Sequence, residues 1–201
     1  ALGKELEKDN VTLAEYEKVY QALEQLEDDA SILIDPDNLN FRLFQSINPK
    51  CRRIEKPNPA IAMKAVKNKV EIGHIRKTAV KDGVAMVNFL HWLENEAGDD
   101  ITEVSVADTL YNFRKAQDLF VDNSFDPIMA YRDHSAMCHY SAGPDTDVKI
   151  GNSGLFLTDS GGNYLTGTTD ITRTVSRGNP TRPEIQDYTL VLKRHISVAT
   201  T

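Results

Sequence analysis

The sequence predicts a mixed α+β fold, and three observations support this class. Residues 69–96 carry apolar side chains at the spacing of one long amphipathic helix. Residues 155–175 contain an apolar run, a glycine-containing connection and a β-branched run, which are typical of two paired strands. The first 60 residues alternate between short helical and short strand patterns. Helices and strands are therefore both expected along the chain.

Size and charge narrow the classes of function. With 201 residues, of which 40% are hydrophobic and 26% charged, the chain can form one large or two small globular domains. A net charge of −7 and a pI near 5.2 argue against nucleic acid or an anionic membrane as a partner. No apolar run reaches the roughly 18 residues that would span a bilayer, and the first seven residues are too charged for a signal peptide.

The two cysteines, Cys51 and Cys138, lack the spacing of a metal site and do not make a disulfide scaffold. We therefore expect a reduced, cytoplasmic setting. Cys138 lies beside His139, but adjacent residues of a strand point to opposite faces, so direct activation of the thiol is not expected. We interpret Cys138 as a small buried hydrophobic residue.

The first part of the chain predicts an α-β-α-β order. Thr12 and Glu15 have the spacing of a capping box, so a helix is expected from there to about Glu27. The next elements are a strand, a helix whose pattern is ambiguous, and a second strand, at residues 31–35, 39–47 and 51–55. Because so few strands cannot build a complete core, we interpret residues 1–63 as the end of a preceding α/β domain.

The second part predicts three helices and a sheet. The first helix, over residues 69–96, would bury an apolar face made of Ile72, Ile75, Ala79, Met86, Leu90 and Leu93. Thr102 is the expected N-cap of the next helix, whose buried stripe would be Val106, Leu110 and Phe113. The sheet is expected to begin with a strand over residues 124–131. Thr181 and Glu184 form a capping box that starts the last helix.

Two carboxylates, Asp159 and Asp170, stand 11 positions apart in the expected pair of strands. Cross-strand neighbours in a hairpin project from the same face, so the two acids can converge. A bulge near Gly161 and Gly162 would adjust the register. Adjacent carboxylates repel each other, and hard divalent cations prefer carboxylate oxygens. The pair therefore indicates a metal site.

The hairpin reads Asp-Ser-Gly-Gly-Asn-Tyr over residues 159–164 and Gly-Thr-Thr-Asp-Ile-Thr-Arg-Thr over residues 167–174. Further motifs fall at residues 67–72, 76–83, 92–94, 124–128, 138–140 and 191–196. In this order they resemble the Xaa-Pro aminopeptidases, which are creatinase-like "pita-bread" metallopeptidases. The resemblance begins at about residue 64. It implies the first half of a pita-bread catalytic domain over residues 64–201, after the small α/β domain that ends at residue 63.

The resemblance implies a function and a role for three residues. The enzyme would hydrolyse the N-terminal Xaa-Pro bond of a peptide with a hydroxide that bridges two metals. Asp159 would bind one divalent metal and Asp170 would bridge two, with manganese favoured and zinc or cobalt as alternatives. His139 would be the catalytic residue that contacts the substrate near the scissile bond. It would hydrogen-bond the developing oxyanion or help a proton reach the leaving nitrogen.

The family completes this site with a histidine and two glutamates from a second half that the chain lacks before Thr201. We therefore expect a fragment of a longer protein, inactive by itself, and a homodimer at full length. Two other interpretations stay open. One is a prolidase, which cleaves Xaa-Pro dipeptides with the same hairpin. The other is a peptide-binding module of this fold without metals, although the presence of both acids argues against it.

The other polar candidates receive plainer interpretations. His195 is expected to pack on the apolar side of the last helix, and His134 to lie in a polar loop. Tyr140 is expected to pack and not to react. Arg173 follows Asp170 by three residues, so we expect it to bond a nearby carboxylate.

Overall fold

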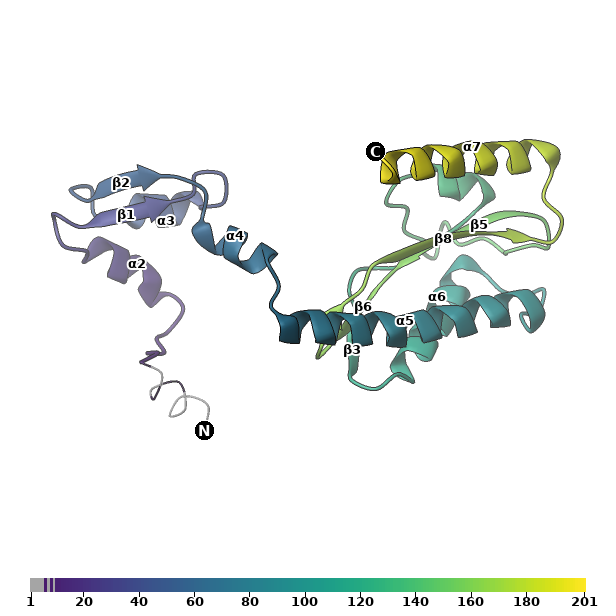
Figure 1. The fold of residues 1–201 in the computed structure, drawn as a ribbon, viewed down its shortest axis with the longest axis horizontal. Helices are drawn as coiled ribbons and strands as arrows, with labels where there is room; N and C mark the ends of the chain where they lie inside the picture. Colours follow the sequence, from purple (N-terminus) through teal and green to yellow (C-terminus); the bar gives the residue numbers. More distant parts are fainter. Residues whose placement is uncertain (1–5, 7, 9) are drawn as a thin grey trace. The chain divides into compact units, whose positions relative to one another are not determined.

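Figure 1 shows the computed structural model, which describes residues 6, 8 and 10–201. The chain divides into two compact units, Ala1–Lys67 and Asn68–Thr201, and each has a hydrophobic core of its own. Within the described residues, no helix is both long enough and apolar enough to cross a bilayer.

The first unit is built around two parallel strands. Its elements are α2 (Lys18–Glu24), β1 (Ser31–Ile34), α3 (Phe41–Ser46), β2 (Arg52–Glu55) and α4 (Pro59–Ala65). In the parallel pair, Ser31 lies opposite Arg52 and Ile34 opposite Glu55. The buried core consists of Ile34, Ile47 and Cys51. The strand, helix and second strand predicted over residues 31–55 are confirmed.

The predicted helix from Thr12 to Glu27 is wrong in its extent. Helix α2 begins only at Lys18, and its N-cap residue, Glu17, makes no side-chain capping bond. The apolar stripe does not extend upstream, because Tyr16 is 85% exposed. Helix α4 was not predicted, although its start has a local cause. The Asn58 side chain accepts a hydrogen bond from the Ala60 amide at 3.0 Å, and a proline in the first turn loses no helical bond.

The second unit combines three longer helices with short strands. Its elements are α5 (Lys69–Asn95), α6 (Glu103–Lys115), β3 (Phe120–Asn123), β4 (Ile128–Tyr131), the 3₁₀ helix η1 (Arg132–Ala136), β5 (Gly154–Ser160), β6 (Gly162–Tyr164), β7 (Gly167–Thr168), β8 (Ile171–Arg177) and α7 (Arg182–Ala199). Strands β4, β5 and β8 form one antiparallel sheet in that order. Strands β3, β6 and β7 form a second one.

The core of this unit lies on one face of β5. Along this strand, residues 154, 156, 158 and 160 are buried, and the residues between them are only partly buried. The buried cluster joins the inner face to α5 and α6 through Met86, Phe89, Leu93, Val106, Leu110, Met129, Tyr131, Ile150 and Phe156. Alternation along a strand therefore places Asp159 on the opposite, half-exposed face.

Helix α5 is confirmed, with Asn68 as N-cap, but its predicted apolar face is half wrong. Met86 and Leu93 are buried as expected, whereas Ile72 and Ile75 are exposed. The polar side chains of Thr78 and Asp82 are buried instead. They face the β6–β7 turn, where the hydroxyl groups of Thr78 and Thr166 lie 2.8 Å apart. A hydrogen-bonded contact, and not an apolar one, therefore decides which side of this half of α5 is covered.

Two strand predictions need correction. The strand expected over residues 124–131 begins only at Ile128, and β3 before it was not predicted. Residues 138–140, expected to be a strand, follow η1 without forming one. Cys138 is exposed there and is not the buried residue that was predicted. The backbone turns here, because His139 has a positive φ of 57°, which an extended strand does not adopt.

The helix starts predicted from capping patterns in this unit are confirmed. Thr102 caps α6 by accepting from the Ser105 amide at 3.2 Å, and Val106 and Leu110 are buried. Thr181 and Glu184 form the predicted capping box of α7. Both caps are formed by side chains three residues apart in the chain, and in this unit, unlike at Thr12 and Glu15, the expected helix starts are present.

Candidate metal centre

The two predicted carboxylates lie on one long hairpin that runs from β5 and β6 into β7 and β8. Ser160 lies opposite Ile171 in the β5–β8 pair, and Asn163 lies opposite Thr168 in the β6–β7 pair. Between these two pairs each strand advances by three residues, so no residue is inserted on either side. The bulge considered near Gly161 therefore does not change the register.

This register places both carboxylates on the same face of the hairpin. Asp159 is directly opposite Thr172, and the Thr172 hydroxyl donates to Asp159 Oδ1 at 2.8 Å. Asp170 stands two residues before Thr172 and one residue before β8 begins, so continued alternation puts it on the side that Thr172 shares. The two acids are therefore diagonal neighbours, an arrangement in which the α-carbons are typically about 7–8 Å apart. Both side chains reach towards solvent, since Asp159 is half-buried and Asp170 is exposed.

A close backbone approach, and not an inserted residue, shapes the hairpin beside the acids. A β-carbon on Gly161 would lie 1.9 Å from the Thr169 carbonyl oxygen and 2.3 Å from Ser124 Oγ. Ser124 bridges the two strands here, because its amide donates to the Gly161 carbonyl at 3.0 Å and its hydroxyl to the Thr169 carbonyl at 2.9 Å. Only glycine fits at residue 161, which is directly opposite Asp170 in the register.

The buried side of the hairpin is held by an ion pair. Arg114 Nε donates to Asp82 Oδ1 at 2.8 Å and Arg114 Nη2 to Asp82 Oδ2 at 3.2 Å. The same Nη2 reaches Ser160 Oγ at 3.1 Å, and the Tyr164 hydroxyl donates to Asp82 at 3.0 Å. Burial, followed by the Asp82 carboxylate, raises the pKa of Tyr164, so its phenol stays protonated and keeps donating. The strand residues that flank Asp159 and Gly161 are thereby tied to both helices.

The donor chemistry of this face fits hard divalent cations. Both groups are carboxylates, and two of them on one face repel each other unless a cation or a proton intervenes. Among residues 6, 8 and 10–201, however, the structure gathers no group of three or more His, Cys, Asp or Glu side chains that could hold a metal ion. Asp159 and Asp170 by themselves therefore supply only part of a coordination shell.

The structure does not place His139 in a strand beside the acids. It lies in the turn after η1, is exposed, and has a positive φ of 57°. Non-glycine residues rarely adopt this conformation, and where they do, the surrounding structure must enforce it. Tyr140, the next residue, is buried as predicted.

The remaining predicted side chains have different outcomes. His195 is exposed on α7 within this chain, so the prediction that it packs is wrong here. Arg173 donates to the Thr172 carbonyl at 2.7 Å and forms none of the ion pairs between described residues, which contradicts the expected bond to a carboxylate. His134 lies in η1, where its Nδ1 is 2.9 Å from the carboxylate of Glu103.

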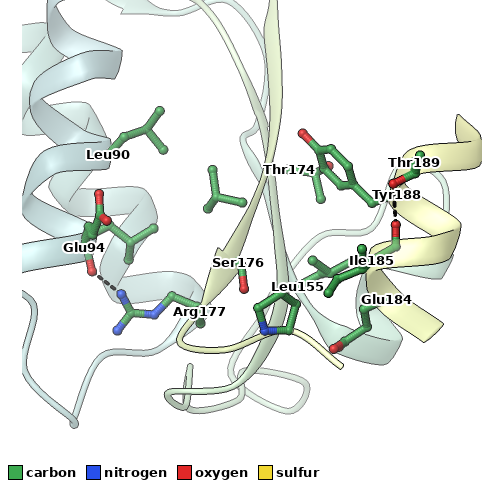
Figure 2. Close-up of a pocket in the computed structure, with 13 residues that line it drawn as sticks. Leu90, Glu94, Leu155, Thr174, Ser176, Arg177, Glu184, Ile185, Tyr188 and Thr189 are labelled. Carbon is green, nitrogen blue, oxygen red and sulfur yellow. Dashed lines mark hydrogen bonds between the residues drawn. The ribbon is translucent and has the colours of Figure 1, made fainter. Parts of the chain in front are cut away.

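A cavity of the second unit lies away from this candidate centre. It lies beside edge strand β8, between α5 and α7 (Figure 2). Its volume is about 520 Å³. Its lining is mainly apolar, with Leu90, Leu155, Ile185 and Tyr188 around it. It contains none of the three predicted site residues, so we assign it no part in the chemistry.

Sequence reasoning missed the buried polar groups under the hairpin, Asp82, Arg114 and Ser160, and it also missed the buried acid Glu103. One signal for Asp82 was available. Asp82 lies four residues before buried Met86, so it continues the buried stripe of α5 at a position that has no apolar side chain. Arg114 occupies the corresponding place on α6, four residues after Leu110. An acid and an arginine in the buried stripes of neighbouring helices indicate an internal ion pair.

The chain matches known families over nearly its whole length. A profile described as metallopeptidase family M24 matches residues 73–201, and the creatinase/prolidase N-terminal domain matches residues 1–71. The probable Xaa-Pro aminopeptidase P of Trichophyton verrucosum (strain HKI 0517) is 37% identical over 199 residues, which cover 94% of this chain. Xaa-Pro aminopeptidase ApepP of Drosophila melanogaster is 39% identical over 155 residues, or 76% of the chain. The chain spans only 28% and 25% of the lengths of these two relatives.

Solved structures give the same result. The X-prolyl aminopeptidase of Caenorhabditis elegans, described as a cytosolic enzyme with a di-nuclear active site, has a TM-score of 0.83 and 33% identity. The match covers 95% of this chain and 32% of that one. The prolidase of Pyrococcus horikoshii OT3 has a TM-score of 0.74 and 25% identity, over 96% of this chain and 54% of that one.

Proposed function

This chain belongs to metallopeptidase family M24, and we propose that the full-length protein carrying it is a metal-dependent aminopeptidase that hydrolyses the N-terminal Xaa-Pro bond of peptides. The predicted family and fold class are confirmed, since a creatinase-type N-terminal domain precedes part of a pita-bread domain. We propose two domains that meet near residue 64, close to the division between the two compact units after Lys67. The observation that carries the functional proposal is the pair of carboxylates on one face of a continuous hairpin.

In this proposal Asp159 and Asp170 hold two divalent ions, with manganese favoured over zinc or cobalt. When bound, such ions lower the pKa of a water and polarise the scissile carbonyl. Thr172 orients Asp159 by donating to one carboxylate oxygen, which leaves the other oxygen to point elsewhere. Asp170 is exposed and directly opposite Gly161, so no side chain across the strand crowds it.

His139 is proposed to act on the substrate itself. Its imidazole would donate to the oxygen that becomes negative at the scissile carbonyl, or pass a proton towards the leaving nitrogen. Proline matters because its amide nitrogen carries no hydrogen and its φ is fixed. As in any amide hydrolysis, the leaving nitrogen takes up a proton when the bond breaks. A site shaped for the ring, with no N–H to satisfy, can select proline.

The test uses the full-length protein with manganese. We expect it to cleave a tripeptide with proline in second place, and Asp159→Asn or Asp170→Asn to lower kcat/KM by more than the roughly 100-fold typical of losing an outer-shell partner. Asp37→Asn, an exposed acid in the first unit, is the matched control and should change nothing. Equal activity in all three variants would contradict the proposal.

The same assay separates the alternatives. Cleavage of an Xaa-Pro dipeptide in place of the tripeptide would indicate a prolidase. Peptide binding without cleavage, and without heat on manganese titration, would indicate a peptide-binding module. We also propose that the 201-residue chain alone is inactive, because two carboxylates make an incomplete coordination shell. Robust hydrolysis by that chain would contradict this part.

The proposal extends to setting and assembly. We propose a cytoplasmic enzyme that is a homodimer at full length and takes a peptide substrate, with neither nucleic acid nor membrane as a partner. Its support is the acidic charge and the kinship with a cytosolic enzyme. Light scattering of the full-length protein gives the assembly directly, and a monomer would contradict it.

A further inference from the structure

Glu103 is a fully buried acid that lies outside the candidate metal centre. It is the first residue of α6 and has 0% exposure. Its Oε1 accepts from the Tyr131 amide at 2.7 Å, and its Oε2 accepts from the Tyr140 hydroxyl at 2.8 Å. Nδ1 of His134 lies 2.9 and 3.0 Å from the two oxygens. Among the described residues, every bond partner of this carboxylate comes from one short stretch of chain, residues 131–140.

The bonds to Glu103 hold the stretch at its beginning, middle and end. Tyr131 ends β4, His134 lies within η1, and Tyr140 closes the turn after η1. The rings of His134 and Tyr140 also contact each other, with centroids 4.5 Å apart. Burial, together with the neighbouring Glu103 carboxylate, raises the pKa of Tyr140, so its phenol remains a donor. The stretch is thus anchored to α6 by a single carboxylate.

His139 is an exposed residue inside this anchored stretch, next to buried Tyr140. It has a positive φ and lies in two consecutive hydrogen-bonded turns. In these turns the Met137 amide donates to the His134 carbonyl, and the Tyr140 amide donates to the Met137 carbonyl. A histidine keeps such a backbone conformation only if its neighbours leave it no alternative. Tyr140, bonded to Glu103, is the neighbour immediately after it.

We propose that Glu103 is the positioning residue for His139: its buried carboxylate fixes both ends of residues 131–140 and so sets where the His139 imidazole meets the substrate. This proposal rests on the proposed function, because it is the reaction that gives His139 a task. Glu103 touches no substrate itself. A purely structural anchor would stabilise the fold but would not act through His139, and the two cases differ measurably.

The matched change is Glu103→Gln, which keeps the shape and removes one acceptor oxygen. The amide is neutral, so the bonds from Tyr131, His134 and Tyr140 lose the strength that the negative charge gives them, in either orientation of the amide. The control is Glu71→Gln, which alters an exposed first-turn acid of α5.

The first measurement is amide hydrogen exchange of the full-length protein. Glu103→Gln should raise exchange within residues 131–140 by about tenfold or more and leave β5 and β8 unchanged, whereas Glu71→Gln should leave residues 131–140 unchanged. Unaltered exchange at residues 131–140 in Glu103→Gln overturns the proposal. This arm needs no activity, so a full-length protein that cleaves no Xaa-Pro peptide contradicts the proposed function while the exchange still decides whether Glu103 holds the stretch.

The second measurement is a double-mutant cycle on kcat with Glu103→Gln and His139→Ala. Glu103→Gln alone should lower kcat by about 10- to 100-fold with little change in KM, and should cost nothing further once His139 is alanine. Losses that multiply would show that Glu103 acts independently of His139, which overturns the proposal. If Glu103→Gln fails to fold, Tyr140→Phe removes one of the same bonds and goes through both measurements.

Discussion

The two ends of helix α6 bury opposite charges. Glu103, its first residue, is 0% exposed, and Arg114, one residue before its last, is 1% exposed. An anion at the N-terminus and a cation at the C-terminus both interact favourably with the helix dipole. A tyrosine hydroxyl also donates to the buried carboxylate at each end. Tyr140 donates to Glu103, and Tyr164 donates to Asp82, the ion-pair partner of Arg114. The helix thus stabilises two sites by the same electrostatic rule.

The two ends differ in what they hold. Arg114 meets Asp82 with two parallel bonds and reaches Ser160, so it ties regular elements to each other. A guanidinium fork matches both oxygens of a carboxylate, which makes this end geometrically rigid. Glu103 instead collects three separate donors from an irregular stretch. The Arg114 end of α6 therefore supports the hairpin of the candidate metal centre, and the Glu103 end supports the loop that contains His139.

The largest expected effect comes from breaking the arginine end. Arg114→Met leaves the Asp82 carboxylate buried without its partner, which typically costs about 3–5 kcal/mol of unfolding free energy. Denaturant unfolding of the full-length protein measures it, and the strands of the hairpin should show raised hydrogen exchange. The double variant Asp82→Leu with Arg114→Met removes both charges and should recover much of the loss. A single variant as stable as the parent would show that the pair is not structurally important.

A matched pair of tyrosine variants compares the two ends directly. Tyr164→Phe and Tyr140→Phe each remove one phenol that donates to a buried carboxylate, and each should cost about 1.5–3 kcal/mol. Only Tyr140→Phe should loosen residues 131–140, and only Tyr164→Phe should loosen the β6–β7 turn. Hydrogen exchange distinguishes the two patterns. Identical patterns would contradict the division of labour between the ends.

The same variants carry a pH signature. Burial, and then the acid beside it, raises the pKa of each tyrosine above the value near 10 that a phenol has in an unfolded chain. Such a raised pKa stabilises the fold fully below about pH 10, and the contribution is lost as the pH rises further. Each phenylalanine variant should therefore show a shallower loss of stability above pH 10 than the parent.

The smallest effect is expected at an exposed ion pair that serves as the reference. Lys149 Nζ lies 2.6 Å from Asp100 Oδ1, as close as the buried pair, but both side chains are mostly exposed. Asp100→Asn should leave the unfolding midpoint unchanged at neutral pH, since exposed pairs contribute little. The Lys149 hydrogen bond lowers the pKa of Asp100, so any contribution exists above about pH 4 and disappears as the pH falls below it. A loss of stability as large as that of Arg114→Met would contradict the expectation that burial decides how much an ion pair contributes.

Local signals predicted much of this fold. The caps at Thr102 and Thr181 and the helix after Asn68 depend on side chains within four residues of each other, so the sequence suffices to find them. The strands around Asp159 were predicted for a similar reason, because β-branched runs flank a glycine-rich connection. The expected convergence of Asp159 and Asp170 agrees with the observed register, and their metal ligation stays a prediction.

Other elements could not be predicted because distant partners decide them. Thr78 and Asp82 are buried because the β6–β7 turn offers hydrogen bonds. Cys138 is exposed because it lies in the turn at His139, outside the sheet. The apolar pattern of α5 gave no sign of the hydrogen-bond partners of Thr78 and Asp82. Helix α2 is shorter than its capping pattern suggested, since no apolar surface covers Tyr16.

The sequence by itself determined the family, the order of the main elements and the pair of acids on one hairpin, because motifs, caps and alternation act over a few residues. Only the tertiary structure decided which polar groups are buried and what they hold. The reason is physical: a buried charge is tolerated only when donors from distant segments meet it, and no single segment reveals that meeting. Glu103 and Arg114, at the two ends of one helix, are the two buried charges that show this dependence on distant donors and acceptors.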